Sequence, residues 1–91
     1  MTSTWIKANG ETKDVSPMNG TDFSLEEAQG FVGGYIEVVR LSPTQIMIVN
    51  EEGIIRGMRL NENASLIATM SHGFSYPIYG DVLVCPDEML K

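Results

Sequence analysis

The sequence predicts a small α+β domain, in which two short helices pack on one face of an antiparallel sheet of about five or six strands. Short runs of β-branched and aromatic residues recur between turn residues, which is typical of strands. Two other segments carry apolar residues at helical spacing behind a capping residue. The chain has 91 residues, of which 43% are hydrophobic, enough for one modest core. We therefore expect a single domain over residues 1–91, with its core at 4–85 and a polar tail at 86–91.

The N-terminal segment predicts a hairpin with strands at residues 4–8 and 12–15. Asn9-Gly10 lies between them and favours a type I′ turn, because both residues tolerate a positive φ. The returning strand is polar, so we expect it at an edge of the sheet, ending at Pro17.

A first helix is predicted to begin after Ser24, which has the side chain of an N-cap. Glu27, three residues later, completes a capping box, and Gly33-Gly34 ends the helix. Its apolar residues at helical spacing are Leu25, Ala28, Phe31 and Val32.

Residues 35–59 predict an antiparallel meander. Its strands are expected at 35–41 and 45–50, with a third beginning at 54–56. A second helix over residues 62–70 follows, with Asn61 as its cap. An aromatic-rich loop then leads to a final strand at 81–85, which is closed by Pro86.

The charge balance bears on the classes of partner. Twelve acidic residues oppose six basic ones, and the net charge of −6 divides evenly between the two halves of the chain. Proteins that bind nucleic acid through its phosphates usually carry a basic surplus, so we expect no direct nucleic-acid binding. The charge favours a basic partner surface instead.

Other features exclude further classes. A single cysteine forms no internal disulfide and no cysteine-based zinc site, and no paired spacing of metal ligands or phosphate-loop pattern is present. We therefore expect no metal and no cofactor. No apolar run approaches the roughly 20 residues of a membrane helix, and no signal peptide is evident, which predicts a cytoplasmic protein without membrane contact.

Three arginines form the most suggestive polar group, because arginine binds phosphates and carboxylates in a bidentate manner. Arg40, Arg56 and Arg59 all lie in or beside the expected meander. Arg56 and Arg59 would point to opposite faces of an unbroken strand, unless Gly57 marks a bulge. Surface ion pairing with the abundant acids is the alternative interpretation.

Aromatic and acidic residues supply the remaining candidates. The loop residues Phe74, Tyr76 and Tyr79 are suited to stacking on a base or anchoring an interface, or they fold back over the core. Glu37 and Asp81 adjoin apolar strands, and each would be a ligand-binding candidate if it faced a cavity rather than solvent.

Cys85 and His72 are the only residues of their kinds, so a nucleophile pair is formally open. Because Cys85 lies within an apolar strand, we favour its role as a small hydrophobic residue.

Four stretches resemble a family of small uncharacterised proteins of bacteriophages and bacterial mobile elements. They are a GGYIEVV strand at 33–39, a VNEEG turn at 49–53, an N-x-x-A segment at 61–64 and a GDVLV strand at 80–84. The resemblance implies a phage or mobile-element origin, and small acidic proteins of that origin resemble counter-defence factors such as inhibitors of CRISPR nucleases. In an infected host, the cytoplasm would then be the site of action.

The resulting hypothesis is a non-enzymatic phage-type binding protein, which counters a host defence by masking a defence protein. One alternative is a sponge that sequesters a nucleotide second messenger of host immunity, with arginines on phosphate and tyrosines on a base. Another is a structural or interaction protein of a phage without a defence role. A sponge would use a site between the subunits of a homo-oligomer, since one domain of this length offers little concave volume.

Overall fold

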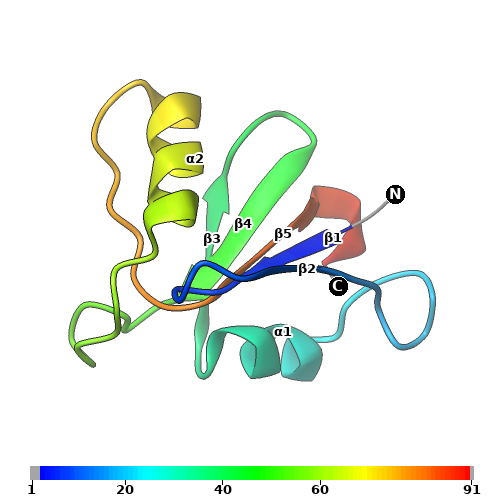
Figure 1. Cartoon of the computed structure of the whole chain (residues 1–91). Helices are drawn as coiled ribbons and strands as arrows, with labels where there is room; N and C mark the ends of the chain where they lie inside the picture. Colours follow the sequence, from blue (N-terminus) through cyan, green and yellow to red (C-terminus); the bar gives the residue numbers. More distant parts are fainter. Residues whose placement is uncertain (1–2, 91) are drawn as a thin grey trace.

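A computed structural model describes residues 3–90, which form one antiparallel five-stranded sheet and two helices (Figure 1). The predicted α+β class is confirmed. The strand order across the sheet is β2-β1-β5-β4-β3. The elements are β1 (Ser3–Ile6), β2 (Thr12–Val15), α1 (Leu25–Val32), β3 (Ile36–Arg40), β4 (Gln45–Asn50), α2 (Glu62–His72), β5 (Val82–Pro86) and a 3-10 turn (Asp87–Met89).

The two helices cover opposite faces of the sheet, so the prediction that both lie on one face is wrong (Figure 1). Successive side chains of β4 alternate between the faces: Ile46 and Ile48 pack with the α1 cluster, Met47 and Val49 with the α2 cluster. The central strands are therefore apolar on both faces, and each face requires its own cover. We call these the α1 face and the α2 face.

The expected third strand of the meander, at residues 54–56, is also wrong. Residues 51–57 form consecutive turns, in which Arg56 N donates to Glu52 O at 2.8 Å and Met58 N donates to Gly53 O at 2.9 Å. The C-terminal strand β5 occupies the place beside β4 that a third meander strand would take. Gly57, at φ 67°, therefore belongs to a turn and marks no bulge.

The first hairpin closes differently from the predicted type I′ turn. Gly10 has a φ of 98°, whereas no residue other than glycine has a positive φ in the described chain, so Asn9 does not. Gly10 N donates to Lys7 O at 3.0 Å, and Lys7 N donates to Glu11 O at 2.8 Å. The loop is thus one residue longer, with glycine alone taking the left-handed conformation.

Both predicted helix caps are confirmed. Ser24 Oγ accepts from Glu27 N at 3.1 Å, and Glu27 Oε1 accepts from Ser24 N at 3.0 Å, which completes the capping box of α1. Asn61 Oδ1 accepts from Ala64 N at 3.0 Å at the start of α2. That helix ends at His72, two residues beyond the predicted end at residue 70.

The end of the chain is packed rather than a polar tail as far as residue 90. Met89 O accepts a hydrogen bond from Phe23 N at 2.6 Å, and Met89 and Leu90 pack on the α1-face cluster. Lys91, the last residue of the expected tail, lies outside the described residues.

Candidate functional site

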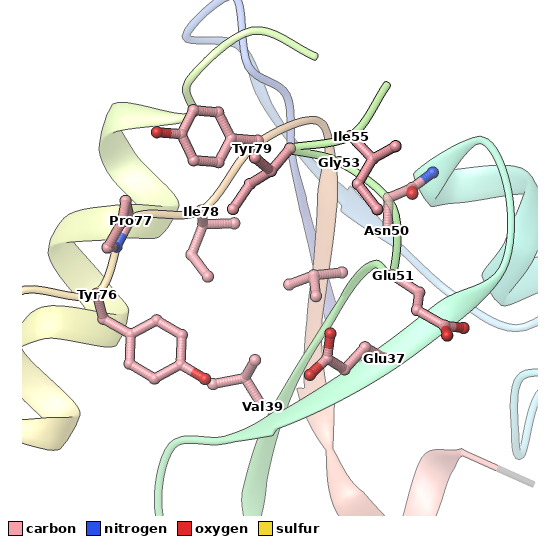
Figure 2. A pocket seen from close by; sticks show the side chains of 12 residues that line it. Glu37, Val39, Asn50, Glu51, Gly53, Ile55, Tyr76, Pro77, Ile78 and Tyr79 are labelled. Carbon is pink, nitrogen blue, oxygen red and sulfur yellow. The ribbon is translucent and has the colours of Figure 1, made fainter. Parts of the chain in front are cut away.

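A cavity of about 390 Å³ opens on the α2 face, between the edge strand β3, its neighbour β4 and the segment that follows α2 (Figure 2). Its walls come from the two strands, the 51–57 turn and the aromatic loop. The lining residues are Glu37, Val39, Val49, Asn50, Glu51, Gly53, Ile54, Ile55, Tyr76, Pro77, Ile78 and Tyr79.

The strand wall of the cavity carries a carboxylate beside apolar side chains. Glu37 and Val39 alternate along β3 with residues that face α1, so both are directed to the α2 face. Figure 2 shows the Glu37 carboxylate turned toward the side of the cavity where Tyr76 lies, with the Tyr76 hydroxyl near Val39. The site thus combines a negative charge, an aromatic ring and an aliphatic floor.

The opposite wall is fixed to α2 by hydrogen bonds. Ser65 Oγ accepts from Ile78 N at 2.8 Å, and Asn61 N donates to Ile78 O at 2.8 Å. Thr69 Oγ1 accepts from Tyr76 N at 3.0 Å. The aromatic loop, residues 73–81, therefore runs alongside the helix as a second wall, and the backbone that carries its tyrosines is bonded to α2.

The turn at the mouth of the cavity is also fixed. Asn50 is buried, its Nδ2 donates to Val32 O at 3.1 Å, and its Oδ1 accepts from Glu52 N at 2.8 Å. Gly53 is so close to Tyr79 that a Cβ at this position would lie 2.8 Å from the Tyr79 carbonyl oxygen. Glycine is therefore required for the turn to meet the aromatic loop.

The fixed turn presents two large apolar side chains to solvent. Ile54 is 72% exposed and Ile55 is 85% exposed, and both line the cavity. The salt bridge found within residues 3–90 joins Arg40 to Asp87 at 3.0 Å. The Glu37 carboxylate therefore has no ion pair within the described chain. Exposed isoleucines beside an unpaired carboxylate are features of a binding surface.

The three predicted arginines are not brought together. Arg40 pairs with Asp87, away from the cavity, and its Nη1 also donates to Pro43 O at 3.2 Å. Arg56 Nη1 donates to Gly33 O at 3.1 Å, near the end of α1. Arg59 lines a separate hollow of about 100 Å³ that also includes Lys7.

Of the aromatic and acidic candidates, Glu37, Tyr76 and Tyr79 meet in the cavity. Phe74 lies beside it, 60% exposed, with its ring stacked 6.0 Å from that of Tyr76. Asp81 serves the fold, because its Oδ1 accepts from Ala8 N at 2.8 Å and ties the first hairpin to β5.

Cys85 and His72 lie on opposite faces of the sheet. Cys85 is fully buried in the α1-face cluster, where burial, with a smaller contribution from Asp87, raises the pKa of its thiol to about 11. His72 is exposed at the end of α2, with its ring 4.8 Å from that of Tyr76. The favoured interpretation of Cys85, a small hydrophobic residue, agrees with this environment.

The sequence did not predict the roles of Ile54 and Ile55 at the cavity or of the buried Asn50 in the turn. Both isoleucines are β-branched and predicted a strand, although their position directly after Glu-Glu-Gly indicated a turn.

The described residues hold no group of three or more His, Cys, Asp or Glu that could bind a metal ion. Within the same part of the chain, neither helix has the length and apolarity needed to cross a membrane.

A family model described as a domain of unknown function, DUF3846, matches residues 6–89. The chain belongs to this family, and the prediction that it is a member of a family of small uncharacterised domains is confirmed at that level. No curated protein and no solved structure matches the chain.

Proposed function

We propose that this DUF3846 chain is a non-enzymatic binding protein that acts by masking a surface of a partner protein. The observation that carries the proposal is the α2-face cavity, with Ile54 and Ile55 exposed at its mouth and Glu37 in its wall. Exposed apolar side chains on a hydrogen-bonded turn beside a hollow supply the desolvated centre that a protein interface needs.

The charge of the chain suggests the kind of surface that is masked. A net charge of −6 steers the chain toward basic surfaces, such as the nucleic-acid groove of a nuclease. The resemblance to phage and mobile-element proteins adds a biological context, in which the masked protein is a host defence protein such as a CRISPR nuclease. A phage interaction protein without a defence role would use the same surface on another partner.

The nucleotide sponge is the weaker alternative. It requires the three arginines to bind the phosphate of the nucleotide together, and they lie apart in the structure. Arg40 and Arg56 are engaged with other groups of the chain. Arg59 and Lys7 share a hollow of about 100 Å³, which favours a single phosphate over a whole nucleotide. A sponge would therefore need a second subunit to complete its site, so it depends on the predicted homo-oligomer.

The test is transformation of bacteria that carry a CRISPR nuclease programmed against the incoming plasmid. We expect the chain to restore transformation and the purified chain to bind the nuclease, with an association rate that falls as salt is raised. Ile55→Asp places a charge at the interface and should lower potency at least about tenfold.

Met18→Asp is the matched control, because Met18 is also an exposed apolar residue, 91% exposed, whose backbone N donates to Glu27 Oε2 of α1 and which does not line the cavity. Neither substitution should shift the free energy of unfolding by more than about 0.5 kcal/mol, since both side chains are in solvent. Equal loss of potency in both variants, or no restoration by the unmodified chain, would contradict the assignment to a nuclease.

A further inference from the structure

The cavity adjoins an unpaired edge of the sheet. β3 is the outermost strand on its side, and its backbone bonds to β4 through alternate residues. Tyr35 O accepts from Glu51 N, and Leu41 N donates to Gln45 O, both at 2.9 Å, which fixes the odd-numbered residues as the ones bonded to β4. The N–H and C=O groups directed away from β4 are those of Ile36, Val38 and Arg40.

The two edges of the sheet differ in how they discourage pairing. The opposite edge strand, β2, is polar, includes Lys13 and Asp14, and is followed closely by Pro17. β3 contains no lysine or proline, and the side chain of Val38 is 45% exposed. Its two charged residues are Arg40, which is paired with Asp87, and Glu37, which lines the cavity. Because lysine and proline commonly protect an edge strand, β3 is the less protected edge and the better one for a further strand.

A strand added beside β3 would place every second side chain against the cavity. Directly opposed residues of neighbouring antiparallel strands have Cβ atoms roughly 5 Å apart, so a side chain opposite Glu37 or Val39 enters at the cavity wall. A long cationic side chain at that position reaches the Glu37 carboxylate and the ring of Tyr76. A carboxylate and an aromatic face both attract a cation, and arginine suits both.

We infer that β3 and the cavity together bind an extended segment of the partner protein that carries an arginine. Its backbone pairs with β3 as a sixth strand, its guanidinium group lies between Glu37 and Tyr76, and apolar neighbours of the arginine pack beside Val38 on the α1 face. This inference rests on the proposed function and names the chemistry of the partner segment.

The probe is a fluorescein-labelled peptide, Thr-Thr-Val-Arg-Val-Thr-Thr, whose binding is followed by fluorescence anisotropy. In a strand, its arginine faces the cavity and its two valines face the α1 side. Replacing arginine by citrulline, a neutral analogue of similar shape, should weaken binding about tenfold, because it removes the charge-assisted hydrogen bond. A peptide N-methylated on the amides that face β3 should lose binding by a similar factor.

Variants of the protein test each half of the site. Glu37→Gln should weaken binding of the arginine peptide about tenfold and leave the citrulline peptide within about twofold, which defines a double-mutant cycle. Glu26→Gln, the same change on α1, is the control. By NMR hydrogen exchange, the bound peptide should protect the outward amide of Val38, while the amide of Val39, which faces β4, stays as it was.

Three results would overturn the inference: equal binding of the arginine and citrulline peptides, equal binding of the N-methylated peptide, or no protection of the Val38 amide. Sedimentation of the chain alone is a fourth measurement, because a dimer abolished by Val38→Pro would make a second copy the occupant of the edge. If the peptide fails to bind while Ile55→Asp still lowers the potency of nuclease inhibition, this inference falls and the proposed function stands. Peptide binding without inhibition supports the inference and removes the nuclease assignment.

Discussion

The two faces of the sheet are each covered by one helix and each holds a buried apolar cluster, but they differ in the side chains that fill them, and the cavity of about 390 Å³ opens on the α2 face. On the α1 face, Phe23 is fully buried and Phe31 packs edge-on against both Phe23 and Trp5, at ring distances of 5.8 and 5.3 Å. On the α2 face, the buried side chains of the helix are alanines, Ala64 and Ala68. These small side chains fill little of the space between α2 and the sheet, and Tyr76 and Ile78 of the aromatic loop pack into the same cluster. We therefore expect the aromatic packing of the α1 face to stabilise the fold more than the side chains that border the cavity, where the proposed binding surface lies.

Truncating one aromatic residue on each face is the strongest test of this difference. Phe23→Ala should lower the free energy of unfolding by about 3–5 kcal/mol, since it leaves a cavity in a packed core. Tyr76→Ala should cost less than about 2 kcal/mol, because this side chain borders a cavity that already exists. Urea unfolding followed by circular dichroism measures both, and equal costs would refute the contrast between the faces.

The helix caps offer a second comparison, of smaller expected effect. Asn61 is buried, and its Nδ2 donates to Ile6 O at 3.0 Å and to Gly80 O at 2.9 Å while its Oδ1 caps α2. Asn61→Ala should cost about 2–4 kcal/mol, because two buried carbonyl groups lose their donor. Ser24→Ala, which removes only the cap of α1, should cost about 1 kcal/mol. The two free energies of unfolding come from the same urea titration, and a larger cost for Ser24→Ala would show that Asn61 is merely a cap.

Local signals in the sequence predicted the elements well, and tertiary pairing explains where they failed. The capping residues Ser24 and Asn61 and the apolar run of β4 act within a few neighbouring residues, so their patterns identify the helices and the strand. Ile54-Ile55 is apolar and β-branched, and only the pairing of β4 with the distant β5 excludes it from the sheet. The strand propensity of a segment carries no information about whether another strand already occupies the neighbouring position in the sheet.

The candidate site shows the same division. Glu37 and Tyr76 were recognisable as site residues from their neighbours, because each carries a polar or aromatic group beside an apolar strand or loop. That they line one cavity, while Arg40 and Arg59 lie elsewhere, depends on the strand order and on the helices covering opposite faces. An even distribution of charge along the chain gave no sign of either arrangement.

Acid titration provides the smallest expected effect and probes the start of α1. The pKa of Glu27 is lowered, first by the hydrogen bond from Ser24 N and then by that from Met18 N. Because its pKa is lower in the folded than in the unfolded chain, Glu27 stabilises the fold above the unfolded value, near 4.5, and this stabilisation is lost as the pH falls through the folded value. Glu27→Gln should therefore lower the urea midpoint at pH 7 and change it much less at pH 3.

Glu62→Gln, in the first turn of α2, controls for the interaction of a carboxylate with the helix dipole. A difference between Glu27→Gln and the unmodified chain that persists undiminished at pH 3 would mean that the side chain acts by packing rather than by its charge.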